Sequence, residues 1–376
     1  MSESVLVDFV YCHPVGHAIE ALQYCLGYKR ADPRRRVGVV LNANTPAELA
    51  HWCADVDEVY TVDIDVFEPP EADVLAHIPR DWDWVFDDAR GHQEWQCEFF
   101  PGLGRYYRLA GERFRARKRH GVVGDGSAEY RPGERLRIEP PATVPESGGV
   151  PQIAVLPAGS AERSLYPTLD SWVRILRAVR ARFGEVRLRV LGKLAADGRT
   201  STGFAAEEFT ALAERVDGVR LDLDLPLAEQ LALLRSCSML LSPHTGFGFT
   251  ALAVGTPWLV LAGNHWPEYY FNPGVPFYSV LPDIQRFPCY RPILGDGSLD
   301  DPEPVDDQGP RSPSMCADRI EGDLEELLDA AGLLLAGELD FEAAMTGHFR
   351  RLSALYEGRH ERMYSVDGIH LNYLPG

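Results

Sequence analysis

Short apolar runs alternate with stretches of helical periodicity along the first part of the chain. Residues 5–11 are mostly apolar, as expected of a strand buried on both faces of a parallel sheet. Apolar residues then recur at helical spacing from His17 onwards, and Gly27 is placed to end that helix. The next predicted elements are a strand, a helix and a strand, over 36–41, 45–54 and 59–62. This order predicts right-handed βαβ units in a doubly wound sheet, with a functional edge at the carboxyl ends of its strands.

The same alternation returns after residues 131–151, a segment rich in Pro, Gly and Glu that is typical of an interdomain linker. The strands predicted in this second part are 153–156, 186–191, 219–221, 239–242 and 258–261. The predicted helices are 169–183, 204–215, 227–236 and 250–254, followed by a last helix over 341–356. Two α/β domains in tandem, each with a parallel sheet, are expected to face each other across a cleft.

Three parts of the chain are expected on this basis: 1–145, 146–340 and a carboxy-terminal segment over 341–376. A length of 376 residues supports two domains, because a single core stops growing at roughly 250 to 300 residues. Residues 294–314 are acidic and rich in Pro and Gly but lack the spacing of a calcium loop, which predicts a surface loop.

The charge of the chain restricts its partners. The formal net charge is -19 and the sequence pI is near 5.0, so an average surface repels nucleic acid and anionic membranes. One basic run, 113–120, is either a solvated helix face, the simpler interpretation, or a contact for an anionic acceptor or phosphate. The first residues lack a leader pattern and no stretch reaches about 18 uninterrupted apolar residues, which predicts a cytoplasmic protein without integral membrane contact. Seven scattered cysteines without a CxxC pair indicate free thiols and not a zinc site.

Three segments at strand-to-helix junctions carry groups that can do chemistry, and the first follows the opening strand. Gly16 lets the turn run close to a ligand. His17, near the helix start, can act as a general base for an acceptor hydroxyl because the unperturbed pKa of histidine lies near neutrality. His13 competes for this role, and either histidine can instead satisfy hydrogen bonds of the turn. Asp8, in the strand itself, can orient a histidine or serve as a buried cap.

The second segment, 157–160, follows the first strand of the second part. Gly159, Ser160, Arg163 and Ser164 offer backbone N–H groups, hydroxyls and a guanidinium, which are groups that bind phosphate oxygens. An ordinary turn has the same composition, so this pattern leaves both interpretations open.

The third segment, 240–257, is the most informative of the three. An apolar strand is followed by a tight turn and a short helix, and the turn holds His244, Thr245, Gly246, Phe247 and Gly248. Its N–H groups and the positive end of the helix are suited to a diphosphate. A purely structural turn has little need of two glycines beside two hydrogen-bonding side chains, which favours a functional site. The sequence fingerprints of dinucleotide and ATP sites are absent.

In this order the segments resemble glycosyltransferases of the GT-B fold and, among them, glycosyltransferase family 9, the lipopolysaccharide heptosyltransferase family. The resemblance spans most of the chain, and the stretches that carry it are 16–19, 54–63, 157–160, 166–172, 242–263, 288–289 and 316–320. It implies two Rossmann-like domains, of which the first binds the acceptor and the second binds a nucleotide-diphosphate sugar. It also implies that residues 363–373 cross back to the first domain.

The chain departs from the family pattern at residues that carry its chemistry. His17 stands at the position of the catalytic aspartate, and His244 at that of the aspartate that opens the donor loop. Phe249 stands where the family has a histidine, and Ser164 where it has a lysine. These differences argue against ADP-heptose and lipopolysaccharide as substrates. They favour a specialised hydroxyl acceptor, such as a small natural product or a cell-surface glycan precursor.

The mechanism that the resemblance implies is direct displacement with inversion at the anomeric carbon. His17 removes the acceptor proton, while the turn 157–160, Arg163 and the loop 244–248 stabilise the departing diphosphate. No metal or cofactor is expected if helix ends and Arg163 carry that charge.

A segment dense in aromatic and hydrogen-bonding groups, 264–271, follows the donor loop. Asn264 is expected to contact the donor, and Trp266 and Glu268 the acceptor, with an aromatic packing cluster as the alternative. Residues 81–88 are interpreted as a strand and its turn and not as a site.

Two other functions fit the same pattern. One is a GT-B epimerase or hydrolase that uses a nucleotide sugar without an acceptor. The other is a catalytically idle partner protein that binds a nucleotide, suggested by the loss of both family aspartates. The sequence specifies neither the nucleotide base, the sugar and the acceptor nor the oligomeric state.

Overall fold

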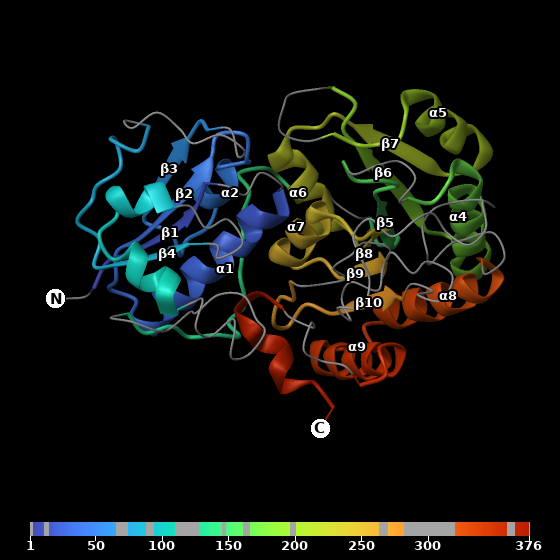
Figure 1. Ribbon diagram of the computed structural model, residues 1–376. Helices are drawn as coiled ribbons and strands as arrows, with labels where there is room; N and C mark the ends of the chain where they lie inside the picture. Colours follow the sequence, from blue (N-terminus) through green and yellow to red (C-terminus); the bar gives the residue numbers. More distant parts are fainter. Residues whose placement is uncertain are drawn as a thin grey trace. The chain divides into compact units, whose positions relative to one another are not determined.

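The structure, a computed structural model, is shown in Figure 1. It describes residues 3–10, 15–64, 74–87, 94–109, 128–144, 148–160, 166–195, 201–262, 270–281, 320–358 and 365–375. Contacts divide the chain into two compact units. Unit 1 comprises Met1–Glu139 and Tyr364–Leu371, and unit 2 comprises Pro140–Met363 and Asn372–Gly376. The division at Glu139 falls inside the Pro-rich segment 131–151.

Unit 1 contains a four-stranded parallel sheet in the order β3-β2-β1-β4. Its strands are β1 (Val5–Phe9), β2 (Val37–Asn42), β3 (Glu58–Val62) and β4 (Trp84–Asp87). Its helices are α1 (Val15–Ala31), α2 (Glu48–His51) and the 3-10 helix η2 (Glu94–Glu98). Every residue of β1, β2 and β4 is buried, which is why these segments read as apolar runs.

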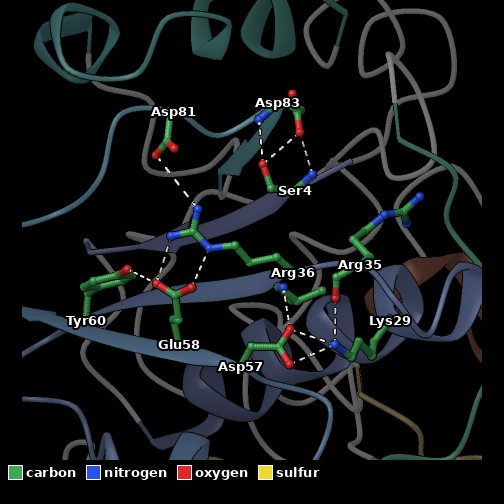
Figure 2. Close-up of polar contacts among 10 residues, drawn as sticks. Ser4, Lys29, Arg35, Arg36, Asp57, Glu58, Tyr60, Asp81 and Asp83 are labelled. Atoms are coloured by element: carbon green, nitrogen blue, oxygen red, sulfur yellow. Dashed lines mark hydrogen bonds and ion pairs between the residues drawn. The ribbon is translucent and has the colours of Figure 1, made fainter. Parts of the chain in front are cut away.

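Charged side chains close the amino edge of this sheet (Figure 2). Lys29 comes from the last turn of α1, and the other linked residues stand at or just before strand starts. The pairs are Lys29 with Asp57, Arg36 with Glu58, and Ser4 with Asp83. Lys29 Nζ lies 2.7 Å from Asp57 Oδ2, and the Ser4 amide donates to Asp83 Oδ2 at 2.7 Å. The polar groups of these residues pair with one another, so this edge stabilises the fold. A ligand site is expected at the opposite, carboxyl edge of the sheet.

Unit 2 contains a six-stranded parallel sheet in the order β10-β9-β8-β5-β6-β7. Its strands are β5 (Gln152–Val155), β6 (Arg187–Gly192), β7 (Val219–Leu223), β8 (Met239–Pro243), β9 (Trp258–Leu261) and β10 (Phe277–Val280). Its helices are α4 (Leu169–Phe183), α5 (Ala206–Arg215), α6 (Leu227–Ser236), α7 (Gly246–Val254), α8 (Ile320–Ala336) and α9 (Phe341–Leu355). The main core joins one face of the sheet to α4, α5 and α8, and α6 packs against α7 (Figure 1).

The α/β class predicted from the sequence, with a parallel sheet in each part, is confirmed. Among the strands and α-helices, β10 and α8 were not predicted; the apolar residues of α8 do recur at helical spacing but are interrupted by Gly322 and Gly332. Helix α7 begins at Gly246 and not at Thr250, because burial of the helix overrides the poor helix propensity of its glycines. No helix in the described part of the chain is both long and apolar enough to cross a membrane.

Candidate functional site

The second and third junctions of the sequence analysis meet at the carboxyl edge of the unit 2 sheet. Strands β5 and β8 are parallel neighbours, with Val155 paired to Leu241, so the turns that follow them are adjacent. A Cβ atom on Gly159 would lie 2.8 Å from Thr245 Cγ2, which is closer than real side chains approach. Glycine is therefore required at position 159 because the Thr245 turn packs directly against it.

Thr245 precedes the first residue of α7 and carries an unused hydrogen-bonding group. Its backbone is extended (φ -145, ψ 155), yet its side chain makes no capping hydrogen bond. The residue is 7% exposed, and Oγ1 has no hydrogen-bond partner among the described residues. The first amides of a helix also lack acceptors within the helix. A buried hydroxyl beside a helix start is suited to an anionic ligand.

His244 is a neutral packing residue and not a source of positive charge. It is 5% exposed, and its ring stacks on Trp258 with centroids 5.8 Å apart and meets Phe249 edge-on. Burial lowers the pKa of His244 to about 4, because removal from water disfavours the imidazolium. This side chain therefore brings no positive charge to the turn.

Packing explains why residue 248 is a glycine. A methyl group on Gly248 would overlap the indole of Trp258, whose Nε1 donates to Ser242 Oγ at 2.9 Å. Close contact between α7 and β9 accounts for the glycine at this position, and the ligand expected at the turn stays a prediction. The signal was ambiguous because glycine serves close helix packing and close ligand approach equally well.

The segment that follows β6 is hydrogen-bonded to the Gly159 turn at the same edge of the sheet. The Gly203 amide donates to the Gly159 carbonyl at 2.8 Å, and the Thr202 amide donates to the Lys193 carbonyl at 2.9 Å. Lys193 was not singled out from the sequence. The available signal was its place directly after the predicted strand 186–191, beside Gly192. Ser160, at the end of the Gly159 turn, is exposed.

In unit 1, His17 lies in the first turn of α1, and Gly16 beside it is buried. Tyr24 of the same helix packs on Phe86 of β4, with ring centroids 4.4 Å apart. His17 precedes Tyr24 by seven residues, about two turns, and therefore occupies the face of α1 directed at the sheet. Its Nδ1 atom is buried, and the residue as a whole is partly exposed.

Asp8 points away from α1. Its neighbour Phe9 packs on Tyr24 of α1, at 5.9 Å between centroids, and successive side chains of a strand face opposite sides of the sheet. Asp8 therefore shares the far face with Asp87, its register partner on β4. This geometry gives no support to an interaction of Asp8 with His17 on α1.

The carboxyl group of Asp8 is fully buried, and neither of its oxygens has a hydrogen-bond partner among the described residues. Burial raises the pKa of Asp8 to about 7, and the backbone amide of Val10 offsets part of that rise. Asp87 beside it accepts a hydrogen bond from the Tyr107 hydroxyl.

Six of the candidate residues fall outside the described part of the chain, namely His13, Arg163, Ser164, Asn264, Trp266 and Glu268. The basic run 113–120 also lies outside it. The structure therefore brings together Gly159 and Thr245 in unit 2 and places His17 and Asp8 in unit 1.

Comparisons with known proteins show the fold. No protein-family model matches the sequence, and no curated protein matches it. The structure is similar to a family 9 glycosyl transferase from Veillonella parvula, with a TM-score of 0.54 and 13% identity over 90% of this chain and 98% of that chain. E. coli heptosyltransferase WaaC with ADP matches at a TM-score of 0.45 and 16% identity, over 68% of this chain and 86% of that chain. The GT-B fold expected from the resemblance to family 9 is confirmed by the Veillonella structure.

Proposed function

We propose that this protein is an inverting, metal-independent glycosyltransferase that moves a sugar from a nucleotide-diphosphate donor to a hydroxyl acceptor. One observation carries the proposal: the buried, unpartnered hydroxyl of Thr245 at the start of α7, packed against the Gly159 turn. The similarity in fold to a family 9 glycosyl transferase supports it.

The donor side of the proposal rests on how a departing diphosphate is stabilised. Negative charge grows on the diphosphate as the bond to the anomeric carbon breaks, and oriented N–H and O–H dipoles stabilise that charge without moving. The Gly246 and Phe247 amides at the start of α7 and Thr245 Oγ1 supply such groups at a buried edge, where they act more strongly than in water. The Gly248 amide already donates to the Thr245 carbonyl.

The acceptor side of the proposal assigns the proton transfer to a histidine of unit 1. His17 is the candidate base, with His13 as its competitor, and Gly16 is the position at which we expect the turn to run close to the acceptor. The acceptor we propose is a small natural product or a glycan precursor. Turnover should be unchanged by EDTA, because helix dipoles and side chains take the place of a metal ion in this mechanism.

Nucleotide binding provides the direct test of the donor site. We expect a thermal-shift screen of UDP, GDP, dTDP, ADP and CMP sugars to show that the sugars of one nucleotide base raise the melting temperature of the protein. A ligand that binds only the native state stabilises that state. Thr245→Val keeps the shape of the side chain and removes the hydroxyl, and should reduce that shift. A screen in which no nucleotide changes the melting temperature would remove the basis of the proposal.

The role of His17 is tested with the donor so identified. His17→Ala should lower kcat by roughly 10²- to 10⁴-fold, the usual contribution of general base catalysis, and leave donor binding intact. Unchanged turnover would exclude His17 as the base. Consumption of the nucleotide sugar at full rate without any acceptor would instead support the epimerase or hydrolase.

A further inference from the structure

We propose that Lys193 supplies a positive charge that faces the donor diphosphate, so that unit 2 selects nucleoside diphosphates over monophosphates. This inference rests on the proposed function, and it adds to it a residue and a substrate preference. It starts from the position of Lys193, which follows β6 at the carboxyl edge of the sheet.

The loop that carries Lys193 is held by backbone contacts on two sides. The Lys193 amide donates to Thr202 Oγ1 at 2.8 Å, and the Thr202 amide donates back to the Lys193 carbonyl. The amides of Leu194 and Ala195 both donate to Asp224 Oδ1, at 2.8 and 2.9 Å. Such a loop presents its side chain from a fixed point, which lowers the entropy lost when a ligand binds.

The same face of the sheet carries Lys193 and α7. Arg189 of β6 binds Gln152 and Asp222, whereas Gly192 packs on Phe209 of α5 on the core face. Alternation along the strand therefore directs Lys193 to the face opposite α5. Helix α7 also covers that face, since its residue Gly248 contacts Trp258.

Strand order sets the distance that the ligand must span. Strand β5 lies between β6 and β8, so Lys193 and Thr245 emerge about two strand spacings apart, roughly 10 Å. The Gly159 turn lies between them and contacts Thr245 directly and the Lys193 loop through Gly203. The flexible four-carbon side chain of a lysine together with two linked phosphates spans such a separation better than the same side chain with a single phosphate.

Charge at this edge supports the assignment of Lys193, alongside Arg163, which the sequence also predicts near the diphosphate but which lies outside the described residues. The described loop residues at the carboxyl edge are 156–160, 166–168, 193–195, 201–205, 224–226, 244–245, 262 and 281. Within these loops Lys193 is the one lysine or arginine, and His244 is uncharged at neutral pH. A diphosphate that binds at a partly buried edge loses part of its hydration. Its charge therefore needs a cation as well as neutral hydrogen-bond donors.

The experiment compares a nucleoside, its monophosphate and its diphosphate, with the base found in the screen. Lys193→Met should weaken binding of the diphosphate by about 10- to 100-fold, the usual effect of losing a charge-assisted hydrogen bond, and leave nucleoside binding unchanged. Lys193→Arg should retain most of the diphosphate affinity. Arg235→Met removes the same charge from the exposed end of α6 and serves as the matched control, with wild-type affinity expected.

Each outcome decides between the two proposals. If the wild-type protein binds no nucleotide, the proposed function fails. If the wild-type protein binds the diphosphate and Lys193→Met binds it equally well, the assignment of Lys193 is wrong and the proposed function stands. If Lys193→Met does not fold, Lys193→Gln is used, and the wild-type preference for diphosphate over monophosphate should also decrease with added salt. If Lys193→Met loses affinity for the nucleoside and for the diphosphate equally, Lys193 has a structural role and the inference is overturned.

Discussion

Burial moves the pKa values of two site residues in opposite directions. His244 is held neutral, with a pKa of about 4, whereas burial raises the pKa of the Asp8 carboxyl to about 7. The cause is the same in both, because removal from water disfavours whichever form is charged. Protonation of His244 therefore opposes folding, and ionisation of Asp8 does so as well.

The stability of the protein should fall at acid pH because of His244. Its pKa in the folded state lies below the ordinary value of 6.5, so its contribution is complete above pH 6.5 and is lost as the pH falls towards 4. Between pH 7 and pH 5 the loss in the free energy of unfolding is about 2 kcal/mol. Urea unfolding of the wild type and of His244→Gln at both pH values isolates the contribution of His244. Asp8 titrates in both proteins, so its effect cancels in the comparison.

The control for that comparison is His51→Gln, which removes an exposed histidine at the end of α2. It should retain the full wild-type difference in unfolding free energy between the two pH values. Equal pH dependence in wild type and His244→Gln would show that His244 is not buried in solution as described here.

At the scale of the elements, α7 is held in position by its contact with β9. Trp258 of β9 fills the space left by Gly248, and its indole N–H donates to Ser242 of β8. The start of α7, with Thr245, is thereby positioned by the sheet beneath it. Close packing of a helix against a strand is thus a condition for the donor site that we propose.

Gly248→Ala should displace α7 from the sheet. The added methyl group overlaps the Trp258 ring, and overpacking of this kind costs roughly 1–3 kcal/mol. Gly347→Ala is the matched control, because a Cβ there meets nothing within 4 Å inside α9, and it should increase stability by up to about 1 kcal/mol. Urea unfolding measures both effects, and equal stability of the two variants would contradict the packing role of Gly248.

At the scale of the whole molecule, the end of the chain contributes to both units. Asp367, in the returning segment Tyr364–Leu371, accepts hydrogen bonds from Gln23, Tyr130 and the Gly133 amide, all in unit 1. A few residues later the Tyr373 hydroxyl donates to Glu342 of α9 in unit 2. Residues 128–133 and the chain end thus stabilise α1, the helix that carries His17.

Asp367→Ala should therefore loosen α1, although the two are far apart in sequence. Loss of these hydrogen bonds should cost about 1–3 kcal/mol and increase hydrogen exchange of the α1 amides. Tyr373→Phe removes only the contact within unit 2 and should leave exchange in α1 unchanged. If both variants exchange like the wild type, the returning segment does not stabilise unit 1.

The sequence by itself determined the α/β class, the parallel sheets and the three strand-to-helix junctions. These features follow from local patterns, because buried strands and amphipathic helices impose their periods on consecutive residues. The resemblance to family 9 added the fold, which agrees with the Veillonella structure.

The tertiary structure alone decided which of these residues meet and in what state. Strand order placed Gly159 between the Thr245 turn and the Lys193 loop, burial made His244 neutral, and packing on Trp258 explained Gly248. Neighbours in the sheet and exposure to water depend on contacts between distant parts of the chain. A local pattern does not specify such contacts, and for this physical reason the place of Lys193 directly after a predicted strand was not enough to single it out from the sequence.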